Sequence, residues 1–112
     1  LNLNNMRDRE NDAAVGKNTL AVKLGFKKSK VYHFSLFILG YVVFPLPILI
    51  AGLPEFPIVL LMVLPVLAIH MVHLIKVIRI KNPVDFDPEL KKVALSAFLF
   101  SLLFFATIVY VL

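Results

Sequence analysis

The sequence predicts an all-α membrane protein with three transmembrane helices preceded by a cytoplasmic helix. Of its 112 residues, 60% are apolar and only 17% are charged, and the mean hydropathy is +0.88. This composition excludes both a soluble globular protein and a disordered chain. The chain contains no cysteine, so a disulfide framework, a thiolate metal site and a cysteine nucleophile are excluded as well.

Three apolar stretches support this prediction. They cover residues 31–51, 57–75 and 93–112, and they are 21, 19 and 20 residues long. A helix rises about 1.5 Å per residue, so each stretch can cross the roughly 30 Å hydrocarbon core of a bilayer. The first stretch is not a signal peptide, because a long polar segment precedes it and two further spans follow. We expect the chain to be a fragment of a longer protein.

Local sequence signals predict where the helices begin and end. Ser29 is expected to cap the first span and Gly52 to end it. Asp87 is expected to cap the third helix, which should begin near Pro88. Prolines inside the first two spans each remove a backbone hydrogen bond and predict kinks, at Pro45, Pro47 and Pro65.

The basic residues predict the orientation in the membrane. All twelve lysines and arginines precede the first span or lie between the second and the third. The connector of residues 52–56 carries a single charge, at Glu55. The positive-inside rule therefore places residues 1–30 and 76–92 in the cytoplasm and the connector outside. This topology explains the net charge of +5 and predicts attraction to anionic lipid headgroups. Nucleic-acid binding is disfavoured, because no aromatic stacking platform accompanies the basic residues.

The first 25 residues carry the candidate chemistry. On a helix, Asn5, Asp8 and Asp12 fall at positions i, i+3 and i+7, so their side chains project from one face. Two carboxylates one turn apart repel each other, and a cation between them would relieve that repulsion. Carboxylate and amide oxygens are ligands that Mg²⁺ prefers, usually completed by water and phosphate oxygens. The spacing alone fits a solvated juxtamembrane helix equally well, because acidic pairs at i and i+4 are common.

Basic residues beside these carboxylates favour a phosphorylated ligand. Arg7, Arg9 and Lys17 supply positive charge for phosphates, and Gly16 is expected to end the helix so that Lys17 reaches back. The pattern predicts a diphosphate held through magnesium. A P-loop is excluded, because Lys17 is not followed directly by Ser or Thr, Asn11 stands where a glycine is required, and no strand precedes the segment.

The same residues resemble a known motif. The second aspartate-rich motif of the UbiA superfamily of membrane prenyltransferases is similar to the run Asn4-Asn5-x-Arg7-Asp8-x-x-x-Asp12-x-x-x-Gly16-Lys17-x-Thr19-Leu20-Ala21-Val22-x-Leu24-Gly25. Its Gly-Lys-x-Thr-Leu-Ala-Val ending is most similar to the branch that prenylates 1,4-dihydroxy-2-naphthoate in menaquinone biosynthesis. In this superfamily three membrane helices follow the motif. The resemblance therefore implies the C-terminal part of a UbiA-like helical bundle, with the other aspartate-rich motif in a missing N-terminal part.

The resemblance also implies a reaction and a set of site residues. Members of the superfamily bind a polyprenyl diphosphate through Mg²⁺ and transfer the polyprenyl group to an aromatic acceptor. By position, Asp8 and Asp12 would be the catalytic, metal-linked carboxylates, and Asn5, Arg7 and Lys17 would bind the substrate. The site would lie on the cytoplasmic side of a bacterial inner membrane, and the fragment alone would be inactive.

Two other functions remain open at this point. The first is a non-enzymatic three-span membrane subunit whose cytoplasmic arm binds lipid headgroups or a partner helix. The second is another diphosphate-using transferase such as a CDP-alcohol phosphotransferase, although the Asp-Gly and Ala-Arg signature of that family is missing here. An aspartate-rich motif upstream of this segment would favour the prenyltransferase.

Polar and aromatic residues within the spans have simpler predicted roles. A metal site at His70 and His73 lacks an evident third ligand, so we expect hydrogen bonds within the bundle. His33 is expected at the membrane interface. The interfacial anchors are predicted to be Tyr32 and Tyr110. Lipid contact or helix packing, with part of the run bordering a prenyl tunnel, is predicted for Phe98, Phe100, Phe104 and Phe105.

Overall fold

Every regular element that the structure describes is a helix, as the sequence predicts. The computed structural model describes residues 1–52, 54 and 56–111, and within them it contains no strand. The molecule is elongated, with extents of 52 × 25 × 21 Å. The predicted external charge at Glu55 lies outside the described residues, and so does the side chain of Tyr110 with its predicted anchoring role.

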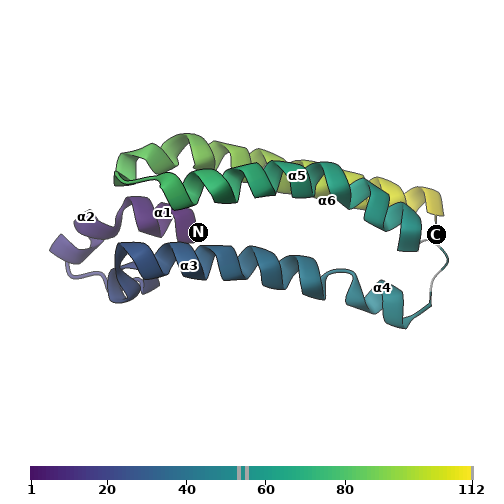
Figure 1. Cartoon of the computed structure of the whole chain (residues 1–112), viewed down its shortest axis with the longest axis horizontal. Coiled ribbons are helices and arrows are strands. Elements are labelled where there is room, and N and C mark those ends of the chain that lie inside the picture. Colours follow the sequence, from purple (N-terminus) through teal and green to yellow (C-terminus); the bar gives the residue numbers. More distant parts are fainter. Residues whose placement is uncertain (53, 55, 112) are drawn as a thin grey trace.

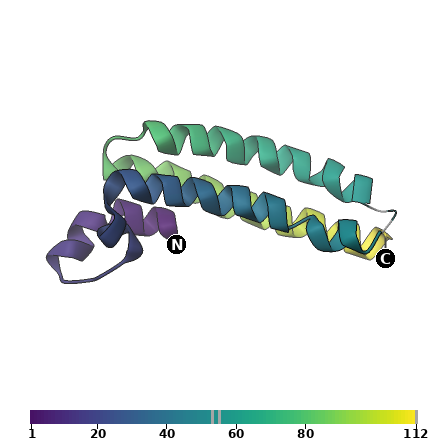
Figure 2. The same cartoon turned by 60° about the horizontal axis from the view of Figure 1, so that its bottom comes forward.

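The long helices run side by side along the molecule (Figure 1). They are α3 (Leu20–Val43), α5 (Phe56–Arg79) and α6 (Asp87–Val111), and the short α4 (Leu46–Ile50) extends the line of α3. Two short helices, α1 (Asn2–Arg7) and α2 (Arg9–Ala14), lie beside the beginning of α3 at one end of the bundle (Figure 2). The 3-10 helix η1 (Pro83–Phe86), which precedes α6, contacts α1 at this same end.

Two helical segments in the described residues are long and apolar enough to cross a membrane. They are Leu20–Ile50 and Phe56–Arg79, judged by length and composition. Residues 93–111 of the third predicted span lie in α6, which is helical as expected, and Leu112 lies outside the described residues. Its insertion in a membrane stays a prediction.

The first long helix begins earlier than the sequence predicts, and Ser29 does not cap it. Thr19 is the N-cap, and its side chain accepts a hydrogen bond from the backbone N–H of Val22 at 3.3 Å. Ser29 is buried inside the helix and donates to the carbonyl of Gly25 at 2.7 Å. Gly25 has a φ of 73°, which interrupts the helical backbone. The local break at this glycine is what the capping prediction missed.

The other predicted boundaries compare more closely with the structure. Pro45 separates α3 from α4, which confirms the predicted interruption. Gly52 follows α4 with a φ of 64°, a conformation that suits glycine. Helix α5 continues through Pro65, and a kink there stays a prediction. Helix α6 begins at Asp87, one residue before the expected start, so Asp87 lies in its first turn rather than at a preceding cap position.

A small apolar cluster joins the two short helices to the end of the bundle. Leu3 and Met6, which are one turn apart on α1, are buried against residues of α3, α5 and η1. The buried members of this cluster are Leu3, Met6, Ala21, Val77 and Phe86. Complete burial of a large apolar side chain contributes about 1.5–3 kcal/mol. This cluster therefore holds α1 in place and sets the position of its polar residues.

Candidate functional site

The aspartate-rich segment folds as two short helices rather than one. Its backbone bends at Asp8, which has φ −87° and ψ 2° and separates α1 from α2. Hydrogen bonds still connect the Asp8 N–H to the Asn4 carbonyl at 2.9 Å and the Asp12 N–H to the Asp8 carbonyl at 2.8 Å. The prediction of a single continuous helix is therefore wrong. Asp8 lies at the junction, while Asn5 and Asp12 lie on α1 and α2.

Gly16 ends α2 in the predicted way. It has a φ of 75°, its N–H bonds the Ala13 carbonyl at 3.2 Å, and the Lys17 N–H bonds the Asp12 carbonyl at 2.8 Å. This is the Schellman arrangement, in which a left-handed residue reverses the chain after a helix. The reversal returns Lys17 toward the helix, and its Nζ lies 3.3 Å from Oδ1 of Asp12. Asp12 is only 6% exposed, whereas Lys17 is exposed.

Arg7 connects the motif to the beginning of α6. Its guanidinium donates to both carboxylate oxygens of Asp8, at 2.8 and 3.0 Å, and to Oδ1 of Asp87 at 2.8 Å. It also donates to Oδ1 of Asn4 at 2.8 Å. The hydrogen bond from Arg7 lowers the pKa of Asp8, and the hydrogen bonds to Asp8 and Asp87 raise the pKa of Arg7. Asp8 is therefore a carboxylate at neutral pH.

The sequence did not indicate the roles of Asn4 and Asp87 in this arrangement. Asp87 lies 80 residues from its partner Arg7, and its position before a proline suggested only a cap. Local spacing contains no signal for a partner at that distance. Asn4 belongs to the recognised motif, but its bond to Arg7 follows from the fold.

The motif presents a charge arrangement that suits a magnesium-bound diphosphate. Asp8 and Asp12 are each paired with a separate basic residue, and Asn5 is half-buried on α1. Within the described ranges there is no group of three or more His, Cys, Asp or Glu side chains arranged to hold a metal ion. Two carboxylates and an amide are still an adequate protein contribution for Mg²⁺, which usually takes one or two carboxylates and completes its shell with substrate phosphates and water. The donor set therefore fits this ion.

A second polar group lies inside the bundle, close to the cytoplasmic end that the sequence predicts. Nε2 of His73 lies 2.9 Å from Nε2 of His33, and Nδ1 of His73 lies 2.7 Å from a carboxylate oxygen of Glu89. Lys92 donates to the other oxygen of Glu89 at 2.5 Å. His73 is 1% exposed and Glu89 is 3% exposed. This confirms the predicted hydrogen bonding of His73 within the bundle. His33 is buried against His73, and its location at the membrane interface stays a prediction.

His70 also makes hydrogen bonds between helices, as predicted. Its Nδ1 lies 2.7 Å from the Tyr41 hydroxyl of α3, and its Nε2 lies 2.7 Å from the Ser96 hydroxyl of α6. The partners Tyr41, Ser96 and Glu89 were not predicted from the sequence. A carboxylate near the start of the third predicted span, together with histidines near the end of the second, was the sequence signal that could have indicated this pairing.

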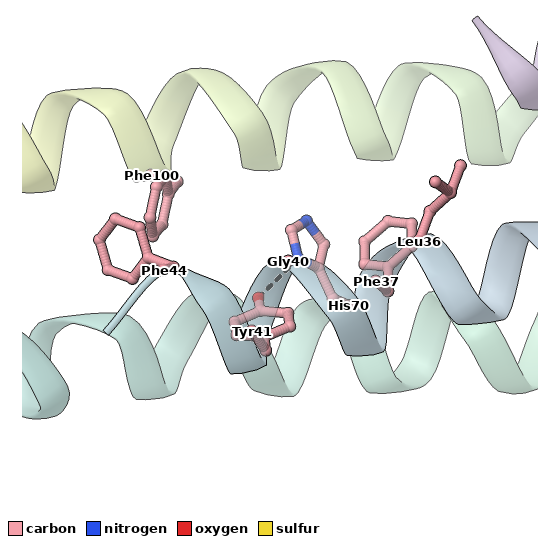
Figure 3. Close-up of a pocket in the computed structure, with 7 residues that line it drawn as sticks. All are labelled: Leu36, Phe37, Gly40, Tyr41, Phe44, His70 and Phe100. Atoms are coloured by element: carbon pink, nitrogen blue, oxygen red, sulfur yellow. Dashed lines mark hydrogen bonds between the residues drawn. The ribbon is translucent and has the colours of Figure 1, made fainter. Parts of the chain in front are cut away.

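An apolar hollow lies between α3 and the other two long helices (Figure 3). It has a volume of about 360 Å³ and is lined by Leu36, Phe37, Gly40, Tyr41, Phe44, His70 and Phe100. The hydrogen bond between Tyr41 and His70 crosses its lining, as the dashed line in Figure 3 shows. An apolar chain fits such a lining better than a charged group does.

The aromatic residues of α6 divide between packing and exposure. Phe100 lines the hollow, and its ring centroid lies 5.0 Å from that of Phe44. Phe104 contacts the same Phe44 ring at 5.3 Å. Phe98 and Phe105 are both exposed, as expected for side chains in contact with lipid. Phe100 is therefore the member of this run that lines the apolar hollow, and Phe104 lines a smaller cavity beside α5.

Comparison with protein families matches residues 1–102 to the UbiA prenyltransferase family. The chain belongs to this family. A curated protein of Haemophilus influenzae named 1,4-dihydroxy-2-naphthoate octaprenyltransferase is 64% identical over 36 residues, which are 32% of this chain and 12% of that protein. No solved structure matches the chain. The family match supports the expected membrane helical bundle, and the short alignment leaves most of the relative's length without a counterpart here.

Proposed function

We propose that this chain is the C-terminal part of a prenyltransferase that transfers a polyprenyl group from polyprenyl diphosphate to an aromatic acceptor. One observation carries the proposal: two motif carboxylates, each beside a basic residue, are docked against the end of helices long enough to cross a membrane. Membership of the UbiA family supports the reaction class and favours an enzyme over a non-enzymatic membrane subunit.

In this proposal, Asp8 and Asp12 are the metal ligands and Asn5 supports them with its amide oxygen. Bound Mg²⁺ would supply positive charge to the diphosphate and so favour its departure. Residues of a second aspartate-rich motif, in an upstream part of the same enzyme, would face these carboxylates across the diphosphate. The 112-residue chain alone is then expected to be inactive, because half of the site is missing.

Arg7 and Lys17 are the proposed partners of the diphosphate. As the prenyl C–O bond breaks and a C–C bond forms to the aromatic ring, negative charge accumulates on the leaving diphosphate, and fixed cations stabilise that charge. The ring carbon that accepts the prenyl group would then lose its carboxylate as CO₂. Both residues are bonded to motif carboxylates in this structure, so they would exchange a carboxylate for a phosphate when substrate binds. The 3.3 Å contact of Lys17 is longer than the 2.8 Å contact of Arg7, so Lys17 should exchange more readily.

The apolar hollow is the proposed place for part of the polyprenyl chain. Its lining is almost entirely apolar (Figure 3). Its lining residues from 36 to 44 lie further along the chain than the beginning of α3, where α1 packs. For the acceptor we propose 1,4-dihydroxy-2-naphthoate, in menaquinone biosynthesis. The name of the Haemophilus influenzae relative and the ending of the motif support this choice.

The proposed setting is a bacterial inner membrane with the motif on its cytoplasmic side. The basic residues support this orientation, because all of them fall in residues 1–30 or 76–92. Helix α6 would then be the third span and return the chain to the opposite side. Its 25 residues are long enough to do so.

Substitution of the two aspartates tests this function in the full-length enzyme. Asp8→Asn and Asp12→Asn should each lower prenyl transfer by at least about a hundredfold, because a neutral amide holds Mg²⁺ more weakly than a carboxylate. Product formation from labelled polyprenyl diphosphate and 1,4-dihydroxy-2-naphthoate measures the effect. The double variant should be little worse than either single variant, because residues that act as one unit are not additive.

Asp85→Asn is the matched control. Asp85 is an exposed carboxylate of η1 at the same end of the molecule, and its loss should leave the rate nearly unchanged. If both motif variants retain wild-type turnover, the assignment of Asp8 and Asp12 is wrong. If a 2-carboxylated naphthalene diol is not prenylated but another aromatic acceptor is, only the acceptor assignment is wrong.

A further inference from the structure

A groove with both basic and apolar walls lies between the beginning of α3 and the end of α5. Its volume is about 920 Å³. Its basic residues are Lys27 and Lys30 from α3, with Arg79 and Lys81 from the end of α5 and the residues that follow. Both views place these segments at the end of the bundle that holds α1 and α2 (Figures 1 and 2).

Lys30 offsets the negative charge of backbone carbonyls at one wall of this groove. Its Nζ donates to the backbone carbonyls of Ile78, at 3.2 Å, and of Ile80. These carbonyls belong to the C-terminal end of α5, which carries partial negative charge and would otherwise repel an anion. Lys30 also lies over the Phe26 ring, 4.4 Å from its centroid, which fixes the ammonium group in position.

The other three cations are free to meet a ligand. Lys27, Arg79 and Lys81 are exposed, and in the part of the chain that the structure describes none of them forms an ion pair. No acidic side chain is among the described residues that line the groove. Elsewhere at this end Arg7 and Lys92 are paired with carboxylates. Exposed lysines without an ion pair in the described residues also lie outside the groove, at Lys23, Lys28 and Lys91.

The apolar wall of the groove favours an anion that carries an apolar part. Val31 is 68% exposed and Ile78 is 57% exposed, and Phe34 is exposed beside them in the same groove. These residues lie on segments long and apolar enough to cross a membrane, next to the basic residues. A small soluble anion would leave this apolar wall in contact with water. A phospholipid satisfies both walls, with its phosphate at the cations and its acyl chains along the apolar side chains.

The geometry points to a binding site for one anionic phospholipid in this groove. The headgroup phosphate pairs with Lys27, Arg79 and Lys81, while Lys30 neutralises the end of α5. An anionic headgroup such as phosphatidylglycerol is preferred to zwitterionic phosphatidylcholine, because choline would place a positive charge among the basic residues. This site does not depend on the prenyl transfer proposed above.

Native mass spectrometry of the full-length protein in detergent tests the site. The protein is mixed with phosphatidylglycerol or with phosphatidylcholine of the same acyl composition, and the retained lipid is counted. The groove variant is Lys27→Gln/Arg79→Gln/Lys81→Gln. The control is Lys23→Gln/Lys28→Gln/Lys91→Gln, which removes three positive charges from exposed residues outside the groove.

We expect one retained phosphatidylglycerol in the wild type and in the control variant. The groove variant should bind it about tenfold to a hundredfold more weakly, since each basic residue near the headgroup contributes to the attraction. Lys27→Arg/Lys81→Arg keeps the charges and should retain the lipid, which separates lost binding from lost folding.

Several results would overturn the proposal. Equal weakening in the groove and control variants would show that only the overall charge attracts lipid. Equal retention of phosphatidylcholine would exclude the preference for an anionic headgroup. Displacement of the lipid by inorganic diphosphate at micromolar concentration would assign the cations to a soluble anion, and a dimer lost only in the groove variant would assign the groove to a second copy of the chain.

Discussion

The docked helix α1 and the long helices differ in the side chains that they bury. Where α1 docks, Leu3 and Met6 are buried, while Arg7 remains partly accessible beside them. Along the long helices the interior holds polar groups such as His73 and Glu89 beside apolar residues such as Val66. Large apolar side chains cover the outside of the same helices, for example Ile50, Leu61 and Phe98.

This difference matches the surroundings expected of each region, with water around α1 and lipid around the predicted spans. In water, burial of apolar surface drives the docking of α1. In hydrocarbon that driving force is absent between helices, and polar side chains gain most by bonding to each other inside the bundle. The boundary between the two arrangements lies near the start of α6, where Asp87 faces Arg7 and Glu89 faces His73. The proposed site therefore occupies the junction between a water-stabilised and a lipid-stabilised region.

The water-stabilised region should be the more sensitive to loss of apolar volume. Met6 is fully buried, so Met6→Ala should destabilise the docked α1 by about 2–5 kcal/mol and reduce prenyl transfer through displacement of Asp8. Hydrogen exchange of α1 in the full-length protein measures the first effect. Val15→Ala is the control, because Val15 is exposed. Unchanged exchange in Met6→Ala would mean that the apolar cluster does not hold the motif.

The start of α6, which lies outside the predicted spans, should instead respond to acid through Glu89. Burial raises the pKa of Glu89, but hydrogen bonds from Lys92 and His73 outweigh this and leave the pKa below its usual value of 4.5. Because folding lowers its pKa, the ionised Glu89 carboxylate contributes its full stabilisation above pH 4.5. That contribution is lost as the pH falls through the pKa of the folded state.

Thermal unfolding in detergent between pH 6 and pH 3 measures this contribution. The wild type should lose thermal stability as the pH falls below about 4.5, and Glu89→Gln should lose less over the same range. Glu10→Gln serves as the control, because Glu10 is an exposed carboxylate outside the bundle. Identical pH profiles for the wild type and Glu89→Gln would contradict the assigned role of Glu89.

Replacement of a glycine by alanine should also affect the two regions differently, although the change in stability is smaller. Gly16 has a positive φ of 75°, so Gly16→Ala should cost about 1 kcal/mol and loosen the contact between Lys17 and Asp12. Gly40 is helical, and a methyl group added to its Cα would meet no other group within 4 Å, so Gly40→Ala should be neutral or slightly stabilising. Thermal melting of both variants compares the two sites. Unchanged melting of Gly16→Ala would show that the chain reversal at Gly16 does not contribute to stability.

Local sequence signals predicted the features that depend on near neighbours. Apolar length indicated the first two long helices, Pro45 indicated the break before α4, and Gly16 indicated the end of α2. The predicted start of the first long helix was wrong, because Thr19 and Ser29 are both chemically suited to cap a helix. Only the break at Gly25 and the burial of Ser29 distinguish them.

Long-range partners were not predictable in the same way. The motif spacing indicated Asp8 and Asp12, yet it contained no information on the bend at Asp8 or on the bond between Arg7 and Asp87. The histidines were expected to find partners inside the bundle, but which residue would face each one depends on the rotation of α3, α5 and α6. Helix packing sets that rotation, and no local spacing specifies it.

The most direct test of the proposed site is the dependence of polyprenyl diphosphate binding on Mg²⁺ concentration in the full-length enzyme. If Asp8 and Asp12 bind the ion, Asp12→Asn should raise the Mg²⁺ concentration needed for half-maximal binding by about tenfold or more. Asp85→Asn should leave it unchanged. If the Asp12→Asn and wild-type binding curves coincide over the whole Mg²⁺ range, this motif does not bind the diphosphate through magnesium.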